Sequence, residues 1–311
     1  MPDADIYFIT GSGNGHQQEC IFRVTNKVPS IWNPVSGTIT PAVFRRIDAN
    51  RTAVAVDMET HGSLFVVFTK QENKEHIAAI TAPEKGLEIL PSQADKSNHN
   101  FNYTIWKDGK YKLTTNTGKE QQFTAALPKP LELNGDWEVR FDPKWGGPEK
   151  TVFKELILWN NHSDPVVKYY SGRAVYVKKF VLNKEQLGIP SRLSVNAAHN
   201  VARVKVNGKE LGILWTFPRI LDIASACKEG ENLLEIEVVN CWANRLIGDA
   251  GLPKEKRFTK TNLYLVPDRK TADWTCKVFQ GFAADDNLLM SGLLGPVVIE
   301  FGKNGEFVLR N

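Results

Sequence analysis

Short runs in which apolar and polar residues alternate are the feature that most limits the fold of this sequence. In "LLEIEVVN" (233–240), Leu234, Ile236 and Val238 occupy every second position, and glutamates fill the positions between them. Successive side chains of a strand point to opposite faces, so the three apolar side chains share one face and the glutamates the other. This period of two predicts a strand with one buried and one solvated face.

Turn residues separate such runs and predict hairpins. "ARVKVNGKELGILW" (202–215) turns at the Asn-Gly pair 207–208, which suits the positive φ angles of a type I′ turn. "TIWKDGKYKLTTNTGKE" (104–120) is interpreted in the same way, with a type I′ turn at the Asp-Gly pair 108–109 and a second turn at 116–118.

Short strands and turns continue through most of the 311 residues without helical alternation. This pattern predicts an all-β fold rather than a Rossmann or barrel enzyme, with one short helix or turn at 152–160. Pro128 and Pro130 stiffen the backbone and mark the best domain boundary. We therefore predict a β-sandwich accessory domain at 1–127, followed by a galactose-binding-like jelly-roll β-sandwich at 131–311.

Composition excludes several classes of partner. The formal net charge is +4 and no run of five basic residues occurs, so a mixed solvated surface is favoured over nucleic-acid binding. No apolar run approaches the ~18 residues of a membrane span. The N-terminus lacks the pattern of a signal peptide, and the compartment stays unknown. The sequence opens directly on a strand pattern, as a chain cut from a larger one would.

Metal and cofactor sites have little support in the sequence. None of the four cysteines forms a C-x-x-C pair or has a histidine at zinc spacing. Cys227 and Cys241 flank one strand, and two buried free thiols are favoured over a disulfide. Asp285 and Asp286 are loop acids that suit calcium, with solvated carboxylates as the alternative. We therefore predict no cofactor and no metal, and structural calcium remains an alternative.

One stretch after a strand, "NCWANRLIGD" (240–249), combines an indole with several hydrogen-bonding side chains. A flat aromatic face stacks on the C–H side of a sugar ring, and amide, guanidinium and carboxylate groups bridge its hydroxyls. Interpreted as a loop, this stretch presents such a set at the rim of the sandwich, and the segment after 202–214 forms a neighbouring rim. The candidate carbohydrate-binding residues are therefore Trp242, Asn244, Arg245, Asp249, Trp215 and Arg219.

Each of these residues also has a structural alternative. Trp242 can pack on its own domain at the edge of the sandwich, and Arg245 can pair with Asp249 four residues on. Trp215 can belong to the core or to a domain interface. Trp145 lies beside two glycines, which favours a tightly packed loop.

Four segments resemble a known family in their order and spacing. They are "GDWEVRFDPKWGGP", "KYYSGRAVYVKKFVL", "ARVKVNGKELGILWTFPRILDI" and "KEGENLLEIEVVNCWANRLIGD". Together they resemble the C-terminal region of family 106 glycoside hydrolases, the α-L-rhamnosidase-like enzymes. The first 70 residues resemble the β-domain that follows the catalytic barrel in that family. The hairpin motif V-N-G-K-x-x-G is similar to the sugar-binding domain of family 2 glycosidases.

The resemblance implies an accessory, sugar-binding region that is not catalytic alone. In the family the general acid and base come from a catalytic barrel upstream, and no β/α repeat is visible in this sequence, so no catalytic residue is carried over. The implied partners are a rhamnose-containing or plant pectin-type glycan and the catalytic barrel of the parent enzyme, whose family is commonly exported. A free-standing carbohydrate-binding module and a structural interdomain spacer remain alternatives.

Overall fold

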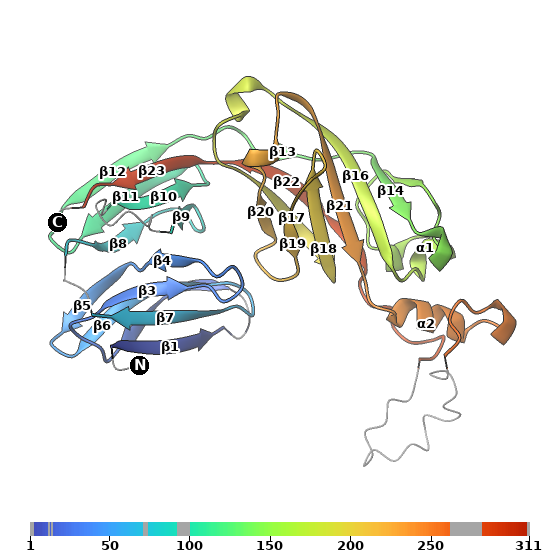
Figure 1. Cartoon of the computed structure of the whole chain (residues 1–311), viewed down its shortest axis with the longest axis horizontal. Coiled ribbons are helices and arrows are strands. Elements are labelled where there is room, and N and C mark those ends of the chain that lie inside the picture. The colour runs from blue at the N-terminus through green and yellow to red at the C-terminus, as the bar shows by residue number, and fades with distance from the viewer. Residues whose placement is uncertain are drawn as a thin grey trace, which may run out of the picture. The chain divides into compact units, whose positions relative to one another are not determined.

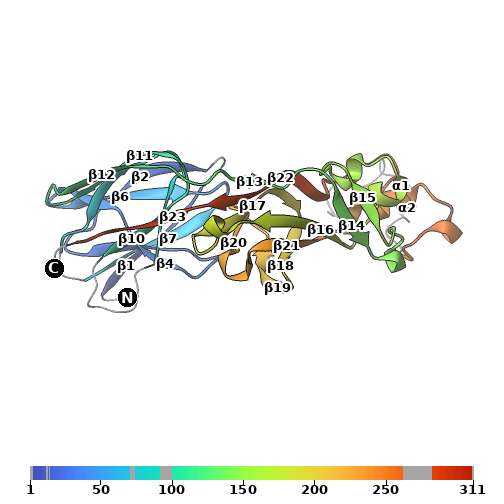
Figure 2. The same ribbon diagram turned by 90° about the horizontal axis from the view of Figure 1, so that it is seen from above.

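A computed structural model of the chain describes residues 3–11, 13, 15–70, 74–91, 100–261 and 282–309. The described residues form mostly β-strands in antiparallel sheets (Figures 1 and 2), which confirms the all-β sandwich prediction. They also form two α-helices, α1 (Pro165–Lys168) and α2 (Ala243–Ala250). Neither of these described helices is long and apolar enough to cross a membrane.

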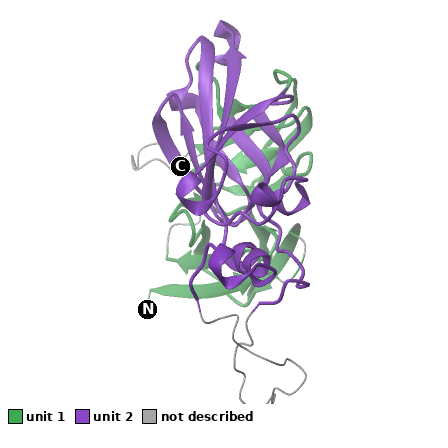
Figure 3. Cartoon of the chain, turned by 90° about the vertical axis from the view of Figure 1, so that its right-hand side faces the viewer, with its two compact units in different colours: residues 1–130, 188–191, 300–311 green, residues 131–187, 192–299 purple. Residues whose placement is uncertain are grey.

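The chain divides into two compact units, coloured green and purple in Figure 3. The first unit comprises residues 1–130, 188–191 and 300–311, and the second comprises 131–187 and 192–299. The sequence predicts a second domain that extends to residue 311, whereas residues 300–311 belong to the first unit. The chain therefore leaves the first unit and later returns to it.

Four sheets build the first unit, in the strand orders β1-β7-β3-β4, β2-β6-β5, β23-β10-β9 and β12-β11-β8. Its strands are β1 (Ala4–Thr10), β2 (His16–Phe22), β3 (Val28–Trp32), β4 (Ile39–Pro41), β5 (Phe44–Asp48), β6 (Arg51–Met58), β7 (Ser63–Thr69), β8 (Ile77–Thr81), β9 (Leu87–Ile89), β10 (Phe101–Ile105), β11 (Gly109–Thr115), β12 (Glu120–Ala125) and β23 (Lys303–Phe307).

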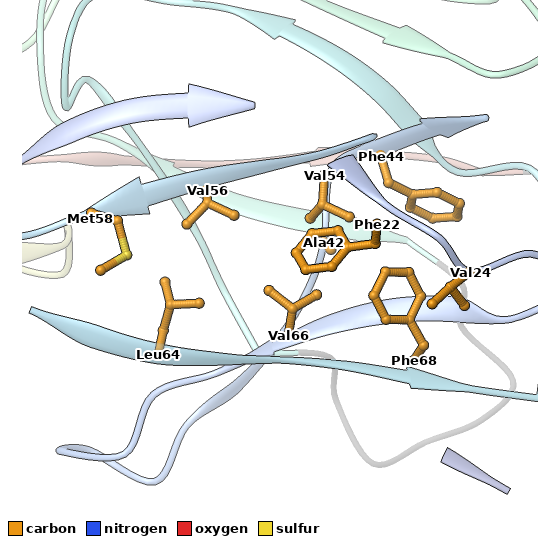
Figure 4. Packing of buried hydrophobic residues seen from close by; sticks show 10 residues of the cluster. All are labelled: Phe22, Val24, Ala42, Phe44, Val54, Val56, Met58, Leu64, Val66 and Phe68. Atoms are coloured by element: carbon orange, nitrogen blue, oxygen red, sulfur yellow. The ribbon is translucent and has the colours of Figure 1, made fainter. Parts of the chain in front are cut away.

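The first core of this unit lies between β6 and β7 and their neighbours (Figure 4). Every second residue of β6, from Val54 to Met58, is buried and faces Leu64, Val66 and Phe68 of β7. Burying one such side chain contributes roughly 1.5–3 kcal/mol, so the period of two in each strand is what joins the two sheets.

A second core cluster packs between the other two sheets and includes Phe101, Tyr103, Tyr111, Leu113 and Phe307. The last of these residues comes from β23, which pairs antiparallel with β10. The C-terminal strand therefore completes a core that was begun about 200 residues earlier in the chain.

The predicted hairpin at 104–120 is wrong in its first turn. β10 and β11 belong to different sheets, and β11 pairs with β12 and β8. Gly109 has a φ of 144°, and its Cα lies so close to Pro83 that a Cβ would meet the proline ring at 2.8 Å. Asp108 accepts a hydrogen bond from the backbone N–H of Leu127. The Asp-Gly pair thus lies where the chain passes from the sheet of β10 to the sheet of β11. The turn at 116–118 joins β11 to β12, as predicted.

Two sheets build the second unit, in the orders β13-β22-β17-β20 and β15-β14-β16-β21-β18-β19. Its strands are β13 (Leu131–Glu132), β14 (Trp137–Phe141), β15 (Thr151–Phe153), β16 (Arg173–Leu182), β17 (Ser191–His199), β18 (Val201–Val206), β19 (Lys209–Leu214), β20 (Ile220–Asp222), β21 (Gly230–Val239) and β22 (Gly292–Phe301). Short 3-10 helices are η1 (Pro143–Trp145), η2 (Trp159–Asn161), η3 (Lys184–Gln186), η4 (Ala224–Ala226) and η5 (Lys254–Lys256).

The strand patterns of this unit are confirmed. Leu234, Ile236 and Val238 of β21 are fully buried, as the alternation predicts. Asn207 and Gly208 have φ angles of 51° and 79° and connect β18 to β19. The positive φ values at both positions are those of the predicted turn.

A buried hydrogen bond ties the segment before α1 to the core. The segment 152–160, predicted as a short helix or turn, completes β15 and begins η2. The indole N–H of Trp159, a fully buried residue, donates to the hydroxyl of Tyr176 at 2.5 Å. The same hydroxyl accepts from the backbone N–H of Leu293 at 3.2 Å, so three distant segments share one buried oxygen.

Candidate functional site

The strand register of the six-stranded sheet brings three exposed tryptophans to one edge. β14 ends opposite the start of β16, which lies opposite the end of β21, and β21 and β19 flank the start of β18. Trp145, Trp242 and Trp215 lie on the segments that follow β14, β21 and β19. The ends of β14 and β19 each lie two strand spacings from the end of β21, about 10 Å. We call this edge the rim of the second unit.

The segment 240–249 is a helix and not the predicted loop. β21 ends at Val239, and α2 begins at Ala243 directly after Trp242. The helix buries most of its residues, including Asn244, Arg245 and Asp249. Gly251 and Pro253 follow the helix and are its sequence-level stop signal. The polar density that suggested a sugar site comes from side chains that point into the protein.

Asn244 holds a distant segment against α2. It is 1% exposed, and its amide nitrogen donates to the carbonyl of Leu289 at 2.8 Å and to the hydroxyl of Ser291 at 2.9 Å. Its amide oxygen accepts from the backbone N–H of Leu289 at 2.8 Å. The amide is therefore occupied inside the protein and does not face solvent.

Asn240 plays a matching part at the end of β21. Its amide oxygen accepts from the backbone N–H of Gly172 at 2.9 Å. Its amide nitrogen donates to the carbonyl of Tyr170 at 2.9 Å and to the hydroxyl of Ser291 at 3.1 Å. The two asparagines thus meet at Ser291 and fix the rim segments to one another.

Arg245 and Asp249 are also buried, at 6% and 0% exposure. The guanidinium of Arg245 lies 4.5 Å from the ring centre of Phe258 and donates to the carbonyl of Trp145 at 3.3 Å. One carboxylate oxygen of Asp249 accepts from the backbone N–H of Thr259 at 2.7 Å and from its hydroxyl at 2.6 Å. Both residues thereby position the segments 145–146 and 258–259 around α2.

Two indoles remain exposed above this buried network. Trp242 is 48% exposed and Trp145 is 44% exposed, and their rings meet edge to face with centres 5.0 Å apart at 82°. The ring of Phe258 lies where a Cβ on Gly146 would be, so only glycine allows this contact. The loop that contains Trp145 is therefore tightly packed, as predicted, but the Trp145 indole is exposed to solvent on the rim.

The second predicted rim segment follows β19. Trp215 is 59% exposed, and the guanidinium of Arg219 lies 4.1 Å from the ring centre of Phe217. Arg219 also donates to the carbonyl of Asn196 at 3.2 Å. Of the six predicted site residues, Trp242, Trp215 and Arg219 thus have solvent-facing parts, while the other three are structural.

The neighbouring tyrosines 169 and 170 have different surroundings. Tyr170 is a core residue whose hydroxyl donates to the carbonyl of Arg173 and accepts from the backbone N–H of Asp142. Burial raises the pKa of the Tyr170 hydroxyl. Tyr169 packs against Gly248 of α2 so closely that a Cβ there would overlap its ring.

No group of three or more potential metal-ligating side chains was found in the part of the chain that the structure describes. Asp286 accepts from the backbone N–H of Ala283 at 2.8 Å and so caps a turn. Cys227 and Cys241 are free thiols, and Cys241 is exposed, so the expectation that both are buried was wrong. Cys276 lies outside the described residues.

The first unit also has a polar pocket that the sequence did not predict. It has a volume of about 540 Å³ and is lined by Arg23, Thr25, Asp48, Asn50 and Arg51. Hydrogen bonds from Arg51 and from the backbone N–H of Asn50 lower the pKa of the Asp48 carboxyl. Arg23 and Thr25 follow β2, whereas Asp48, Asn50 and Arg51 lie at the turn from β5 to β6, and nothing in the local sequence indicates that these two segments meet.

The fold and the rim define the chain as an all-β region of two sandwich-built units. No family model matches the chain. An alignment of 193 positions, which covers 59% of the chain, is 37% identical to a protein of Formosa agariphila that carries the provisional name β-glucuronidase, and it covers 17% of that protein.

Solved structures give a similar result. The chain aligns over 96% of its length with a rhamnosidase from Novosphingobium sp. PP1Y, at 27% identity and a TM-score of 0.67, and covers 23% of that enzyme. A β-glucuronidase from Ruminococcus gnavus in complex with D-glucuronic acid aligns over 38% of the chain, with 20% identity and a TM-score of only 0.33. The matches to the Formosa agariphila protein and to the Novosphingobium rhamnosidase relate the chain to glycoside hydrolases, and the chain spans less than a quarter of the length of each of these two proteins.

Proposed function

We propose that the chain is the non-catalytic accessory and sugar-binding region of a glycoside hydrolase that acts on rhamnose-containing polysaccharide. In this proposal the catalytic barrel belongs to another part of the parent enzyme. The rhamnosidase alignment supports this assignment, because it extends over 96% of the chain but only 23% of the enzyme.

The exposed indole pair carries the sugar-binding part of the proposal. Trp145 and Trp242 are each almost half exposed although both lie at the rim of a well-packed sandwich. An indole face gives a sugar ring a large apolar contact at little cost in conformational entropy, because the side chain has only two rotatable bonds. The edge-to-face contact makes each ring support the other in a fixed orientation.

The buried polar residues give this platform its rigidity. Arg245 holds the carbonyl of Trp145, and Asn244 lies two residues beyond Trp242 in the first turn of α2. A platform that is fixed before the ligand arrives loses less entropy on binding. Asn244, Arg245 and Asp249 therefore act as positioning residues in this proposal, and sugar contact falls to the two indoles.

Calorimetric titration of the whole chain with rhamnose-containing pectic oligosaccharides tests the proposal. We expect binding that weakens about tenfold or more in Trp242→Ala and in Trp145→Ala, since stacking on an aromatic ring contributes about 1–3 kcal/mol when a planar base is the ligand. Trp32→Ala is the matched control, because Trp32 of the first unit is 40% exposed. No binding at millimolar concentration, or equal loss in the control, would refute the sugar site.

The non-catalytic part has its own assay. The isolated chain is incubated with an aryl α-L-rhamnoside and the released phenol is followed. We expect no release above the buffer rate, because the two carboxyl groups that hydrolysis requires would come from the barrel. Turnover at an enzyme-like rate by this chain would contradict the proposal.

A second function, an interdomain spacer, is favoured by one observation. Leu252, Phe258, Leu289 and Met290 are between 39% and 59% exposed, and they belong to the segments that pack on α2 beside the indole pair. An exposed apolar cluster of this kind is typical of a surface that another domain covers. A chain that binds no glycan but binds the parent barrel through this cluster would be a spacer, whereas glycan binding without the barrel favours a free-standing module.

A further inference from the structure

Arg219 is fixed in place at the rim by its contacts to β17. Its carbonyl accepts from the backbone N–H of Val195 at 3.0 Å, and its guanidinium donates to the carbonyl of Asn196 at 3.2 Å. The ring of Phe217 lies against the guanidinium, with its centre 4.1 Å away. The segment 215–219 is short and anchored by β19 at one end and β20 at the other.

The charge of Arg219 has no counter-charge among the described residues. Its contacts there are one carbonyl and one aromatic ring, and its Nε is buried without a hydrogen-bond partner. Burial lowers the pKa of this guanidinium, and no carboxylate offsets that effect. An arginine stays protonated in proteins, so a positive charge is held here at a cost that an anion would relieve.

Among the described residues, His199 is the group whose pKa responds to this charge. Burial and the charge of Arg219 both lower the pKa of the His199 imidazole, and a histidine supplies no negative charge in either protonation state. Trp215, at the start of the same segment, is 59% exposed. An open indole and a fixed, uncompensated guanidinium thus lie four residues apart on one anchored segment.

From this juxtaposition we propose that the segment 215–219 recognises an acidic sugar. The guanidinium of Arg219 pairs with the carboxylate of a uronic acid residue, and Trp215 stacks on the ring of that sugar or its neighbour. A planar guanidinium matches the two oxygens of a carboxylate, which gives charge-assisted hydrogen bonds. The inference rests on the proposed sugar-binding function and adds that the bound glycan is anionic at this position.

The test compares an acid with its ester on the whole chain. Short oligogalacturonides and their methyl esters are titrated at low salt into the native protein. We expect the free acid to bind about tenfold or more tightly than the ester, as a hydrogen bond to a charged group predicts. In Arg219→Met this preference disappears while the weak binding of the ester stays within about twofold.

Two further variants keep the result interpretable. Arg219→Lys keeps the charge but lacks the planar fork, and we expect part of the preference for the acid to remain. Arg140→Gln is the matched control, because Arg140 is exposed in the same unit and its charge already pairs with Glu138. Thermal unfolding of each variant shows whether the protein is folded.

The outcomes separate this inference from the proposed function. Equal binding of acid and ester, both weakened by Trp242→Ala, would overturn the acidic-sugar site and leave the sugar-binding function standing. Equal affinity for a sulfated oligosaccharide would show that Arg219 responds to charge alone, and would overturn the assignment to a uronate. If neither acid nor ester binds and neutral rhamnose oligosaccharides also fail, both proposals fall.

Discussion

Asn244 offers the sharpest test of how the rim is built. The sequence predicted that the Asn244 side chain contacts sugar, whereas in the structure this side chain is buried and forms three hydrogen bonds to Leu289 and Ser291. Replacement by alanine removes all three bonds. The backbone N–H of Leu289 then loses its acceptor, while the Leu289 carbonyl keeps a bond from the Ser291 hydroxyl at 3.2 Å.

These contacts set the expected size of the effect. One buried donor left without a partner costs about 1–3 kcal/mol, and each of the other lost bonds about 0.5–1.5 kcal/mol. We therefore expect Asn244→Ala to lower the free energy of unfolding by about 2–6 kcal/mol. For a unit of this size, that corresponds to a fall in Tm of roughly 4–24 °C.

Tryptophan fluorescence in urea is a suitable assay, because six of the eight tryptophans fall in residues 131–299. The matched control is Asn196→Ala. Asn196 is exposed in the same unit and its side chain donates only to the carbonyl of Gly295, so we expect a loss below about 1 kcal/mol. An Asn244→Ala protein that is as stable as this control, yet loses glycan binding, would refute the positioning role.

Three other predictions concern buried groups. Tyr176→Phe deprives the Trp159 indole and the Leu293 N–H of their shared acceptor and should cost about 2–4 kcal/mol in urea unfolding, and a loss below 1 kcal/mol would contradict this. Burial, with a smaller contribution from Asp222, raises the pKa of Cys227 to about 11, so iodoacetamide at pH 8 should label exposed Cys241 first, as mass spectrometry of the peptides would show. Burial lowers the pKa of His76, whose ring stacks on Phe44, so the folded first unit resists protonation there. The neutral His76 imidazole therefore stabilises the fold fully above the unfolded pKa near 6.5, and this stabilisation is lost as the pH falls. The Tm of the protein should drop between pH 7.5 and 5.5, and it should drop less in His76→Gln.

The strands of the second unit were predictable because each carries its own signal. In β21 the apolar positions alone tell which side chains are buried, and the Asn-Gly pair alone fixes the turn after β18. Local sequence does not say which strands pair. The Asp-Gly pair at 108–109 therefore looked like a hairpin turn, although the strands on its two sides enter different sheets.

The burial of the candidate site residues was predictable only in part, because it too depends on contacts between distant segments. Trp242 and Trp215 are exposed as a binding site requires. The burial of Asn244 depends on residues 289–291, some 45 positions away, and the burial of Asn240 depends on residues 170–172, about 70 positions back. Ala243, Leu246 and Ile247 do follow the spacing of an amphipathic helix, and this periodicity could have revealed α2. It does not reveal that the polar residues Asn244, Arg245 and Asp249 are buried as well.

The return of the chain to its first unit limits how this protein can be divided. Strand β23 supplies Phe307, which is 2% exposed, and its Gly305 approaches the ring of Tyr103 so closely that no Cβ fits. Cutting the chain after residue 299 would therefore remove β23 and leave the edge of β10 unpaired in the sheet β23-β10-β9. A fragment of residues 131–299 alone would still contain residues 188–191, but without the rest of the first unit to which they belong, because the chain crosses the boundary between the units four times. The first unit therefore cannot be produced as one uninterrupted segment of the chain, because it needs residues 300–311 as well as residues 1–130.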